Sequence, residues 1–242
     1  FKSRFGWDKS GASNLEELQE KLRSTFMVRR LKKQVLTDLP DKTRQVIALP
    51  PNGDVKLIDA EWAAYRSLEQ IREELKQAKS DLTENYEEKV QALRSAEQVA
   101  FTEMAAMRKA VALSKVPHVI EHLQSSLAEG PVVLFAHHRD VIRQISEEFP
   151  DHVMIIGDTP TAQRGANVEA FQAKQVPLFI AGLRAASEGI TLTASSHVVF
   201  CELDWTPGRM SQAEDRCHRI GQKNNVLVQH LVLDGSLDSH MA

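Results

Sequence analysis

The 242-residue chain has few of the features that mark secreted or membrane proteins. Only two cysteines occur, Cys201 and Cys217, so there is no disulfide framework and a reducing, intracellular setting is favoured. No apolar run is long enough to span a membrane and no signal peptide is recognisable, so no membrane association is expected. A net charge of −3 gives no overall attraction for nucleic acid, and any DNA contact must come from a local basic surface.

Two further absences bear on catalysis. The sequence has no G-x-x-x-x-G-K-[ST] loop and no Asp-Glu box after a strand, the elements that hold a triphosphate and Mg²⁺ in nucleotide hydrolases. The chain by itself is therefore expected to bind ATP poorly and not to hydrolyse it. With 42% hydrophobic and 26% charged residues it has the composition of a globular protein, and it reads as a piece of something longer.

The chain divides into three expected parts, of which the first two precede the main domain. Residues 1–52 hold a helix that Asn14 could cap and a strand over Thr43–Leu49. Residues 53–112 are rich in charge, and their narrow apolar stripes step by three and four. A break is expected near Ser80–Asn85, so this part is predicted to form an antiparallel helical hairpin.

The third part, residues 113–242, alternates short apolar runs with amphipathic segments. The expected strands are Val132–Ala136, Val153–Ile156, Leu178–Ala181, Val198–Leu203 and Val226–Leu233, and two of the expected helices are Arg139–Phe149 and Thr161–Ala173. Continuous apolar strands separated by helices indicate an α/β fold with a parallel sheet covered on both faces. Ligands of such sheets bind beyond the carboxyl ends of the strands.

A densely charged stretch runs from Gln212 to Gln222 and is predicted to be helical. Pro207 suits a first helical position, Thr206 can cap it, and Gly221 suits a left-handed turn after the last residue. This prediction rests on the start and stop signals alone.

Within that helix, Gln212, Arg216 and Arg219 would share one face, because they are four and then three residues apart. Two forked cations on a rigid element suit a polyphosphate whose charge grows during transfer. The spacing equally fits a solvated charged helix with ordinary surface pairs such as Glu214–His218, and on spacing alone that reading is preferred.

The same stretch, QAEDRCHRIGQ, resembles motif VI of the Swi/Snf-type ATPases, within superfamily two of helicases and translocases. The upstream run ASEGITLTASSHVVFCELDWTPG resembles motif V and the family's Trp-Asn-Pro segment, and the two together are most similar to the annealing-helicase branch. Residues 26–50 resemble the connector between the two ATPase lobes. The resemblance implies a RecA-like second lobe, preceded by a helical connector from an absent first lobe and by a helical protrusion.

The resemblance also implies roles for particular residues in ATP hydrolysis. It makes Arg216 and Arg219 arginine fingers and places Gln212, Glu188 and Gly189 near the nucleotide. ATP with Mg²⁺ would be held mainly by the N-terminal ATPase lobe of the same protein, which is an expected partner.

Two further blocks imply contacts with DNA. Motif V falls at Gly182–Leu192, where Arg184 and Ala185 would face the DNA backbone. Gly182 stands where many relatives carry Ser or Thr, so a hydroxyl contact is lost there. The run Val132–Arg139 resembles motif IV, and its end supplies His137, His138 and Arg139 as phosphate contacts.

Some of these DNA contacts have structural alternatives. A histidine pair such as His137 and His138 at a strand end is as often structural as functional. Arg164, in the block after the second strand, either binds phosphate or fixes its loop. The two interpretations have equal weight for each site.

The segment His118–His122 matches the H-x-x-E-H pattern of a zinc peptidase class, with Glu121 as the base. Five-residue patterns of this kind arise often by chance, and the surrounding apolar residues fit an ordinary packing helix. Zinc catalysis is therefore placed far below the ATPase reading, and no metal site is expected.

The function implied is the second lobe of an ATP-dependent translocase on double-stranded or forked DNA, of the annealing or fork-remodelling kind. Alternatives are a remodeller of nucleosomes or of other protein–DNA complexes, and a non-catalytic module that binds DNA or a partner. The expected location is intracellular, in a nucleus or in a bacterial cytoplasm or nucleoid.

Overall fold

The computed structural model describes residues 2–3, 6–7, 14–28, 30, 32–51, 53–80, 86–185 and 189–242, which fall into two units, Phe1–Leu39 and Pro40–Ala242. The first unit contains the short strands β1 (Lys2–Ser3) and β2 (Gly6–Trp7) and the helices α1 (Leu15–Thr25) and α2 (Lys32–Val35). Helix α1 begins directly after Asn14, as expected. Asn14, however, has a left-handed backbone with φ of 56°, and within the described residues its side chain makes no capping hydrogen bond.

The second unit is built on a parallel sheet, which confirms the α/β prediction. Its described strands are β3 (Lys42–Leu49), β4 (Val132–Ala136), β5 (His152–Ile155), β6 (Leu178–Gly182), β7 (His197–Phe200) and β8 (Val226–Leu233). They lie in the order β3-β8-β7-β4-β6-β5, and each neighbouring pair is parallel. All carboxyl ends therefore meet at one edge of the sheet, called the carboxyl edge below, and all amino ends at the amino edge.

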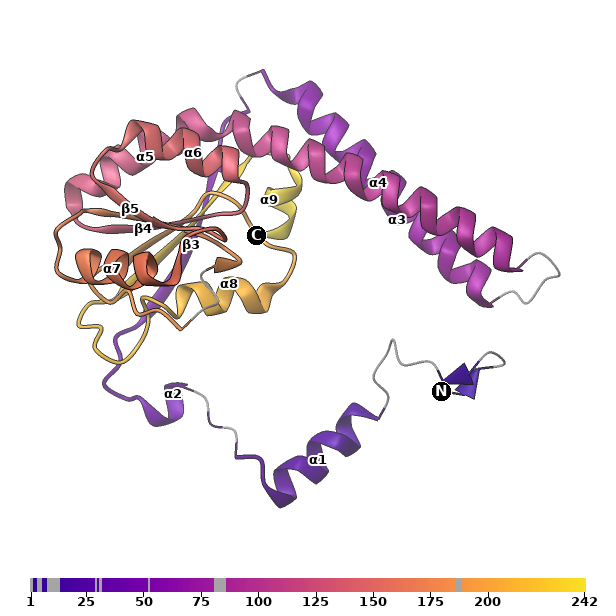
Figure 1. Ribbon diagram of the computed structural model, residues 1–242, viewed down its shortest axis with the longest axis horizontal. Helices are drawn as coiled ribbons and strands as arrows, with labels where there is room; N and C mark the ends of the chain where they lie inside the picture. Colours follow the sequence, from indigo (N-terminus) through magenta and orange to yellow (C-terminus); the bar gives the residue numbers. More distant parts are fainter. Residues whose placement is uncertain are drawn as a thin grey trace. The chain divides into compact units, whose positions relative to one another are not determined.

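Helices cover both faces of this sheet, and the side chains of β4 explain why. All five residues of β4 are buried, and alternate ones enter two separate apolar cores. One core includes Val132 and Leu134, and the other includes Val133 and Phe135. The first lies under α5 (Val116–Glu129) and α6 (Arg139–Glu148), the second over α7 (Thr161–Gln172) and α8 (Pro207–Glu214) (Figure 1). A strand buried on both faces has to be a continuous apolar run.

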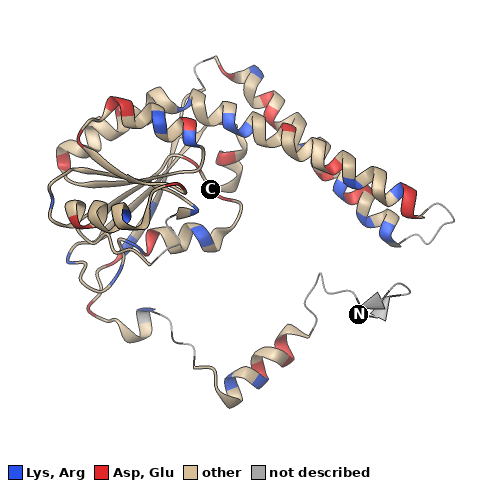
Figure 2. Ribbon diagram, in the orientation of Figure 1, with Lys and Arg blue, Asp and Glu red and all other residues tan. Residues whose placement is uncertain are grey.

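The predicted hairpin is formed by α3 (Val55–Ser80) and α4 (Tyr86–Ser114), which lie side by side (Figure 1). The break falls where it was expected, but residues 81–85 lie outside the described part. Two small apolar cores join the helices, one containing Leu68 and Met104 and the other Leu75 and Val90. Figure 2 shows both signs of charge along the hairpin, as expected for helices that bury one stripe each.

Several contacts fix the base of the hairpin to the sheet domain. The Trp62 indole donates a hydrogen bond of 2.7 Å to the Gly235 carbonyl. Tyr65 stacks on Trp205 with ring centroids 5.8 Å apart, and the Arg108 guanidinium lies 4.8 Å from the centroid of the same indole. The described hairpin and the sheet domain therefore share one interface at the carboxyl edge.

A buried ion pair completes that interface. The Lys115 ammonium, fully buried, lies 2.5 Å from a carboxylate oxygen of Asp238 in α9 (Leu237–Met241) and 3.1 Å from the Leu231 carbonyl. Arg108 binds the other oxygen of Asp238 at 3.2 Å.

Among the described residues, no helix combines the length and the low charge needed to cross a membrane.

Strand β3 belongs to the sheet, although the sequence places it in the connector of residues 1–52. It pairs in register with β8 along its whole length, from Lys42 opposite Val226 to Leu49 opposite Leu233. The division of the chain into two units falls just before it, at Leu39 and Pro40. Strand β3 is thus an edge strand of the sheet.

Candidate functional site

The structure separates the expected site residues into two groups at opposite edges of the sheet. His137, His138 and Arg184 follow β4 and β6 and lie at the carboxyl edge. Arg216 and Arg219 lie at the amino edge. Helix α8 leaves the carboxyl edge after β7 and runs back across the sheet, so the residues that follow it stand where β8 begins. The two arginines therefore lie away from the carboxyl ends of the strands, where ligands of parallel sheets usually bind.

The predicted helix over Gln212–Gln222 is also wrong in extent, because α8 ends at Glu214. The next residues form an irregular turn, Asp215–Gly221, called the arginine turn below. Arg216 and Arg219 therefore do not share a helical face with Gln212, which lies exposed on α8. The start of α8 at Pro207 is confirmed, and so is a left-handed Gly221, with φ of 101°.

Local hydrogen bonds explain why the helix stops. The N–H groups of Arg216 and Cys217 bond to carbonyls three residues back, those of Ala213 and Glu214, at 3.1 Å each. This tighter winding directs the Cys217 side chain into the core, where it is fully buried. Thr206 precedes the helix without a side-chain cap among the described contacts, and the Asp204 carboxylate accepts its N–H at 2.8 Å.

The arginine turn is held to the loop before β7. Leu192 donates its N–H to the Arg216 carbonyl at 2.8 Å. The buried Gln222 amide donates to the carbonyls of Ser195 at 2.7 Å and Cys217 at 3.2 Å. The sequence reading missed Gln222, although it is the last residue of the motif VI string and a polar residue directly after the left-handed Gly221.

The two guanidiniums of the turn are close enough to influence each other. Burial and the neighbouring charge of Arg219 lower the pKa of Arg216, while Asp215 acts in the opposite direction. Arg216 is half-buried and Arg219 is exposed. Arginine keeps its charge in proteins, so the turn presents two neighbouring positive charges on a fixed backbone. This arrangement is suited to binding a multiply charged anion.

The end of α8 is anchored by tertiary contacts in place of a local pair. Glu214 binds Lys42 at 2.6 Å and Arg44 at 2.8 Å, both on β3. The spacing had suggested a surface pair between Glu214 and His218, but the Glu214 carboxylate binds Lys42 and Arg44. The Nε2 atom of His218 instead lies 2.7 Å from the Pro40 carbonyl.

At the carboxyl edge, Glu202 organises the end of β4. Its carboxylate accepts the N–H groups of His137 at 2.7 Å and of His138 at 2.9 Å, and it lies 2.5 Å from Nδ1 of His138. Burial opposes ionisation of Glu202, but the bonds from His138 outweigh it and hold the carboxyl pKa below its usual range. Burial, with the charge of His138, lowers the pKa of His137. His138 therefore has a structural role, whatever else it contacts.

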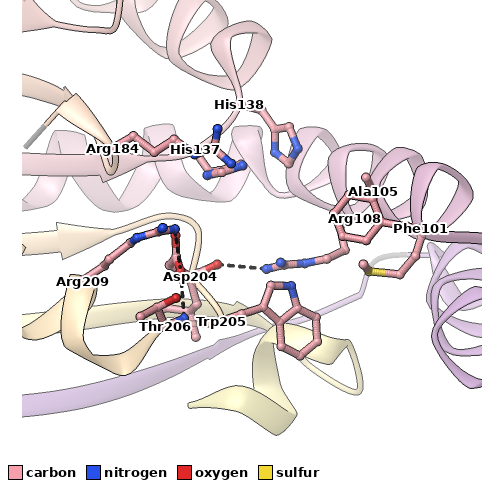
Figure 3. Close-up of a pocket in the computed structure, with 12 residues that line it drawn as sticks. Phe101, Ala105, Arg108, His137, His138, Arg184, Asp204, Trp205, Thr206 and Arg209 are labelled. Atoms are coloured by element: carbon pink, nitrogen blue, oxygen red, sulfur yellow. Dashed lines mark hydrogen bonds and ion pairs between the residues drawn. The ribbon is translucent and has the colours of Figure 1, made fainter. Parts of the chain in front are cut away.

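A cavity of about 170 Å³ opens beside these histidines. Figure 3 shows His137, His138 and Arg184 on one side of it and Asp204, Trp205 and Arg209 on the other, with Arg108 reaching in from α4. Asp204 pairs with Arg209 at 3.1 Å, and Arg108 donates to the Leu203 carbonyl at 2.9 Å. Cationic side chains outnumber carboxylates around this cavity, so it favours an anionic ligand.

Two expected DNA contacts have protein partners nearby. Arg139 pairs with Asp158 at 2.7 Å, and both side chains are largely exposed. Arg164 donates to the carbonyls of Thr159 at 2.8 Å and Gly157 at 3.1 Å, so it fixes the loop after β5. Loop fixing is one of the two roles considered for Arg164, and a phosphate contact by either arginine stays a prediction.

The motif V loop is described only in part. Arg184 is exposed beside the cavity, whereas Ala185 is buried and could offer only its backbone to DNA. Gly189 is exposed, and a Cβ atom there would meet nothing within 4 Å. Glu188, with its neighbours Ala186 and Ser187, lies outside the described residues, so its expected nucleotide contact stays a prediction.

The H-x-x-E-H segment lies on α5, and its second histidine is part of a polar network. Nε2 of His122 lies 2.8 Å from Oε1 of Gln229, which also lies 2.7 Å from Nε2 of His197. Across the described part of the chain, no group of three or more His, Cys, Asp or Glu side chains could hold a metal ion.

Comparisons with known proteins agree with this fold. The model of the helicase conserved C-terminal domain matches residues 114–221. The chain is 33% identical to SWI/SNF-related matrix-associated actin-dependent regulator of chromatin subfamily A-like protein 1 of Xenopus tropicalis, over 98% of this chain and 24% of that protein. It is 35% identical to the DNA annealing helicase and endonuclease ZRANB3 of Bos taurus, over 100% of this chain and 21% of that protein.

The chain thus spans about a quarter of the length of these relatives. Among solved structures, the C-terminal part of the Fun30 ATPase domain resembles it with a TM-score of 0.55 and 16% identity, covering 84% of this chain and 89% of that one. At this identity the likeness shows the fold alone.

Proposed function

The chain is the C-terminal, RecA-like lobe of a SWI/SNF-type helicase-like protein, and from this premise we propose that it completes an ATPase site through Arg216 and Arg219 while it binds DNA at its carboxyl edge. The intact protein would be an ATP-dependent translocase on double-stranded or forked DNA. The observation that supports the ATPase role most directly is that the Arg216 and Arg219 guanidiniums are neighbours on the arginine turn.

The arginine turn supplies what a phosphoryl-transfer site needs from a second lobe. The N-terminal lobe of the same protein would hold ATP and Mg²⁺, and Arg216 and Arg219 would approach the terminal phosphate from across the cleft. An arginine finger contributes about 10³–10⁵ to the rate in this chemistry, because it neutralises charge that develops in the transition state. Gln212, exposed on the preceding helix, would contact the nucleotide beside them.

DNA would bind at the other edge of the sheet. Arg184 and His137 beside the cavity, together with the backbone of Ala185, offer donors and positive charge for a DNA phosphate. Arg139 would join them by exchanging Asp158 for a phosphate. The two sites lie at opposite edges of one sheet, so closure of the lobes on ATP would shift the DNA contact. Repeated closure and opening would then step the lobe along DNA.

The role of the chain as half of a site also explains why it is expected to be inactive alone. No triphosphate-binding loop is present in the sequence. We propose that turnover requires the N-terminal lobe, and an intracellular location is part of the same proposal.

One assay tests both sites: ATP turnover by the intact protein at increasing concentrations of double-stranded DNA. Arg219→Ala and Arg216→Ala should each lower kcat by about 10³-fold or more, with little change in the DNA concentration that gives half-maximal stimulation. Arg184→Ala should raise that DNA concentration and leave kcat at saturation near the wild-type value. The matched control is Arg72→Ala, which removes an exposed arginine of the hairpin that pairs with Glu69 and Glu97.

The outcomes separate clearly. Wild-type turnover in Arg219→Ala would refute the arginine-finger role, and unchanged DNA dependence in Arg184→Ala would refute the carboxyl-edge site. Turnover by the isolated 242-residue chain, abolished by Arg219→Ala, would refute the half-site proposal.

A further inference from the structure

We infer that Glu214 is a positioning residue that clamps strand β3 to the arginine turn and so determines where Arg216 and Arg219 stand. The inference deepens the proposed function and rests on the role proposed for those two arginines. It rests on the contacts between residues 40–44 and residues 214–226, to which none of the sequence motifs gives a role.

Glu214 occupies a position from which it can control the turn. It is the last residue of α8, two residues before Arg216, and only 1% of its surface is exposed. Both of its carboxylate oxygens are bound from β3. Arg44 binds them in a fork, with Nε and Nη2 at 2.8 Å each, and the Lys42 ammonium lies 2.6 Å from Oε2. Forked pairs of this kind restrict direction as well as distance.

Further bonds tie the start of β3 to both sides of the turn. Nε2 of His218, inside the turn, lies 2.7 Å from the Pro40 carbonyl. The Asp41 N–H donates to Oδ1 of Asn225 at 3.1 Å. The Asp41 carbonyl accepts the N–H of Val226 at 2.8 Å. The residues that lead from the connector into the sheet therefore hold the turn before and after its two arginines.

The charges around Glu214 show that its anchoring depends on β3. Lys42 and Arg44 come from β3, Asp215 follows on the turn, and His230 of β8 lies 3.9 Å away. Burial opposes ionisation of Glu214, but the bonds from Arg44 and Lys42 outweigh it, so the pKa of the carboxyl lies below its usual range. A buried carboxylate needs such partners, because an unpaired charge is strongly disfavoured there.

Loss of the clamp would displace the arginines without unfolding the turn. The bonds from Leu192 and Gln222 hold the backbone of the turn from the loop before β7, independently of β3. What β3 adds is a fixed link between the edge of the sheet and the turn. A misplacement of about 1 Å can lower a catalysed rate by about 10²-fold, because the reacting groups must be closely aligned. The clamp should therefore affect kcat more than ATP binding.

The test uses the intact protein at saturating double-stranded DNA. Glu214→Gln keeps the shape of the side chain and removes its charge. We expect kcat to fall at least about tenfold, with the KM for ATP and the DNA concentration for half-maximal stimulation within about twofold of wild type. Lys42→Met should show the same pattern more weakly, because Arg44 still holds the carboxylate.

The control separates positioning from a general loss of stability. Asn167→Ala on α7 removes a buried hydrogen bond of 2.7 Å to the Met154 carbonyl of β5, at the opposite side of the sheet from β3. It should lower Tm and leave kcat unchanged below the unfolding temperature. The inference would be overturned if Glu214→Gln lowered Tm as this control does but kept the wild-type kcat.

The remaining outcomes are also decisive. If Arg219→Ala abolishes turnover and Glu214→Gln does not lower it, the clamp is refuted and the arginine finger stands. If Arg219→Ala retains turnover, the proposed function itself fails. Should Glu214→Gln not fold, Lys42→Met decides: a lowered kcat with unchanged KM supports the clamp, and a wild-type kcat refutes it.

Discussion

Replacing Asp238 should destabilise the chain more than replacing its buried partner Lys115. Asp238 serves two cations at the base of the hairpin, with Lys115 at 2.5 Å and Arg108 at 3.2 Å. Asp238→Asn would remove the carboxylate that, among the described residues, pairs with the fully buried Lys115 ammonium, and would leave that ammonium the Leu231 carbonyl at 3.1 Å. Lys115→Met removes the buried charge itself, and Asp238 keeps Arg108.

The magnitudes follow from that asymmetry. Breaking a buried ion pair by removing one partner costs about 3–5 kcal/mol, because a buried charge is left uncompensated. Lys115→Met leaves a carboxylate that is still paired, and should cost only about 1–3 kcal/mol. Domains of this kind are stable by about 5–15 kcal/mol, so the asparagine variant loses a large share of the total.

Urea denaturation followed by circular dichroism measures both variants. With a slope of about 3 kcal/mol per M, a loss of 3–5 kcal/mol shifts the midpoint by about 1–1.7 M. The double variant Lys115→Met/Asp238→Asn should be more stable than Asp238→Asn alone, since it no longer buries an unpaired ammonium. The reasoning is refuted if Asp238→Asn costs less than Lys115→Met, or if the double variant is the least stable of the three.

Two more predictions concern the hairpin contact and acid stability. Trp205→Ala should lower the unfolding free energy by about 1–2 kcal/mol, because it removes the stack with Tyr65 and the cation–π contact with Arg108 at a half-exposed site; a urea titration identical to wild type would contradict this. Burial lowers the pKa of His230 from its ordinary 6.5, so the unfolded chain binds its proton more readily and stability is lost as pH falls below about 6.5. His230→Phe should therefore flatten part of the decline in Tm between about pH 6.5 and 5, and a decline as steep as in wild type would show that other groups cause it.

The general architecture could be predicted from the sequence, because the patterns that specify it are local. The interior strands β4 and β6 are continuous apolar runs, and both faces of β4 are buried, as such a run requires. The stepped apolar stripes of residues 53–112 likewise require a second helix to cover them, and α3 and α4 cover each other. The motif VI string indicated the family that the comparisons show, and the roles of Arg216 and Arg219 stay a prediction.

The candidate site could be predicted only in part. The sequence treated Gln212, Arg216 and Arg219 as one helical face, whereas the helix ends at Glu214 and the arginines lie on a turn. The sequence also did not show that the arginine turn stands at the amino edge, away from the carboxyl ends where ligands of parallel sheets usually bind. Start and stop signals describe where a helix can run, but they did not show that the hydrogen bonds of Arg216 and Cys217 tighten after Glu214 and end it there.

By itself, the sequence determined the parallel sheet, the helical hairpin, the family and the residue types that bear charge. Only the tertiary structure decided which charges meet. Glu214 binds Lys42 across 172 positions of the chain, and His218 binds the Pro40 carbonyl across 178. Sequence periodicity predicts only which residues share a face of the same helix or strand. No spacing in the sequence could therefore reveal these distant partners.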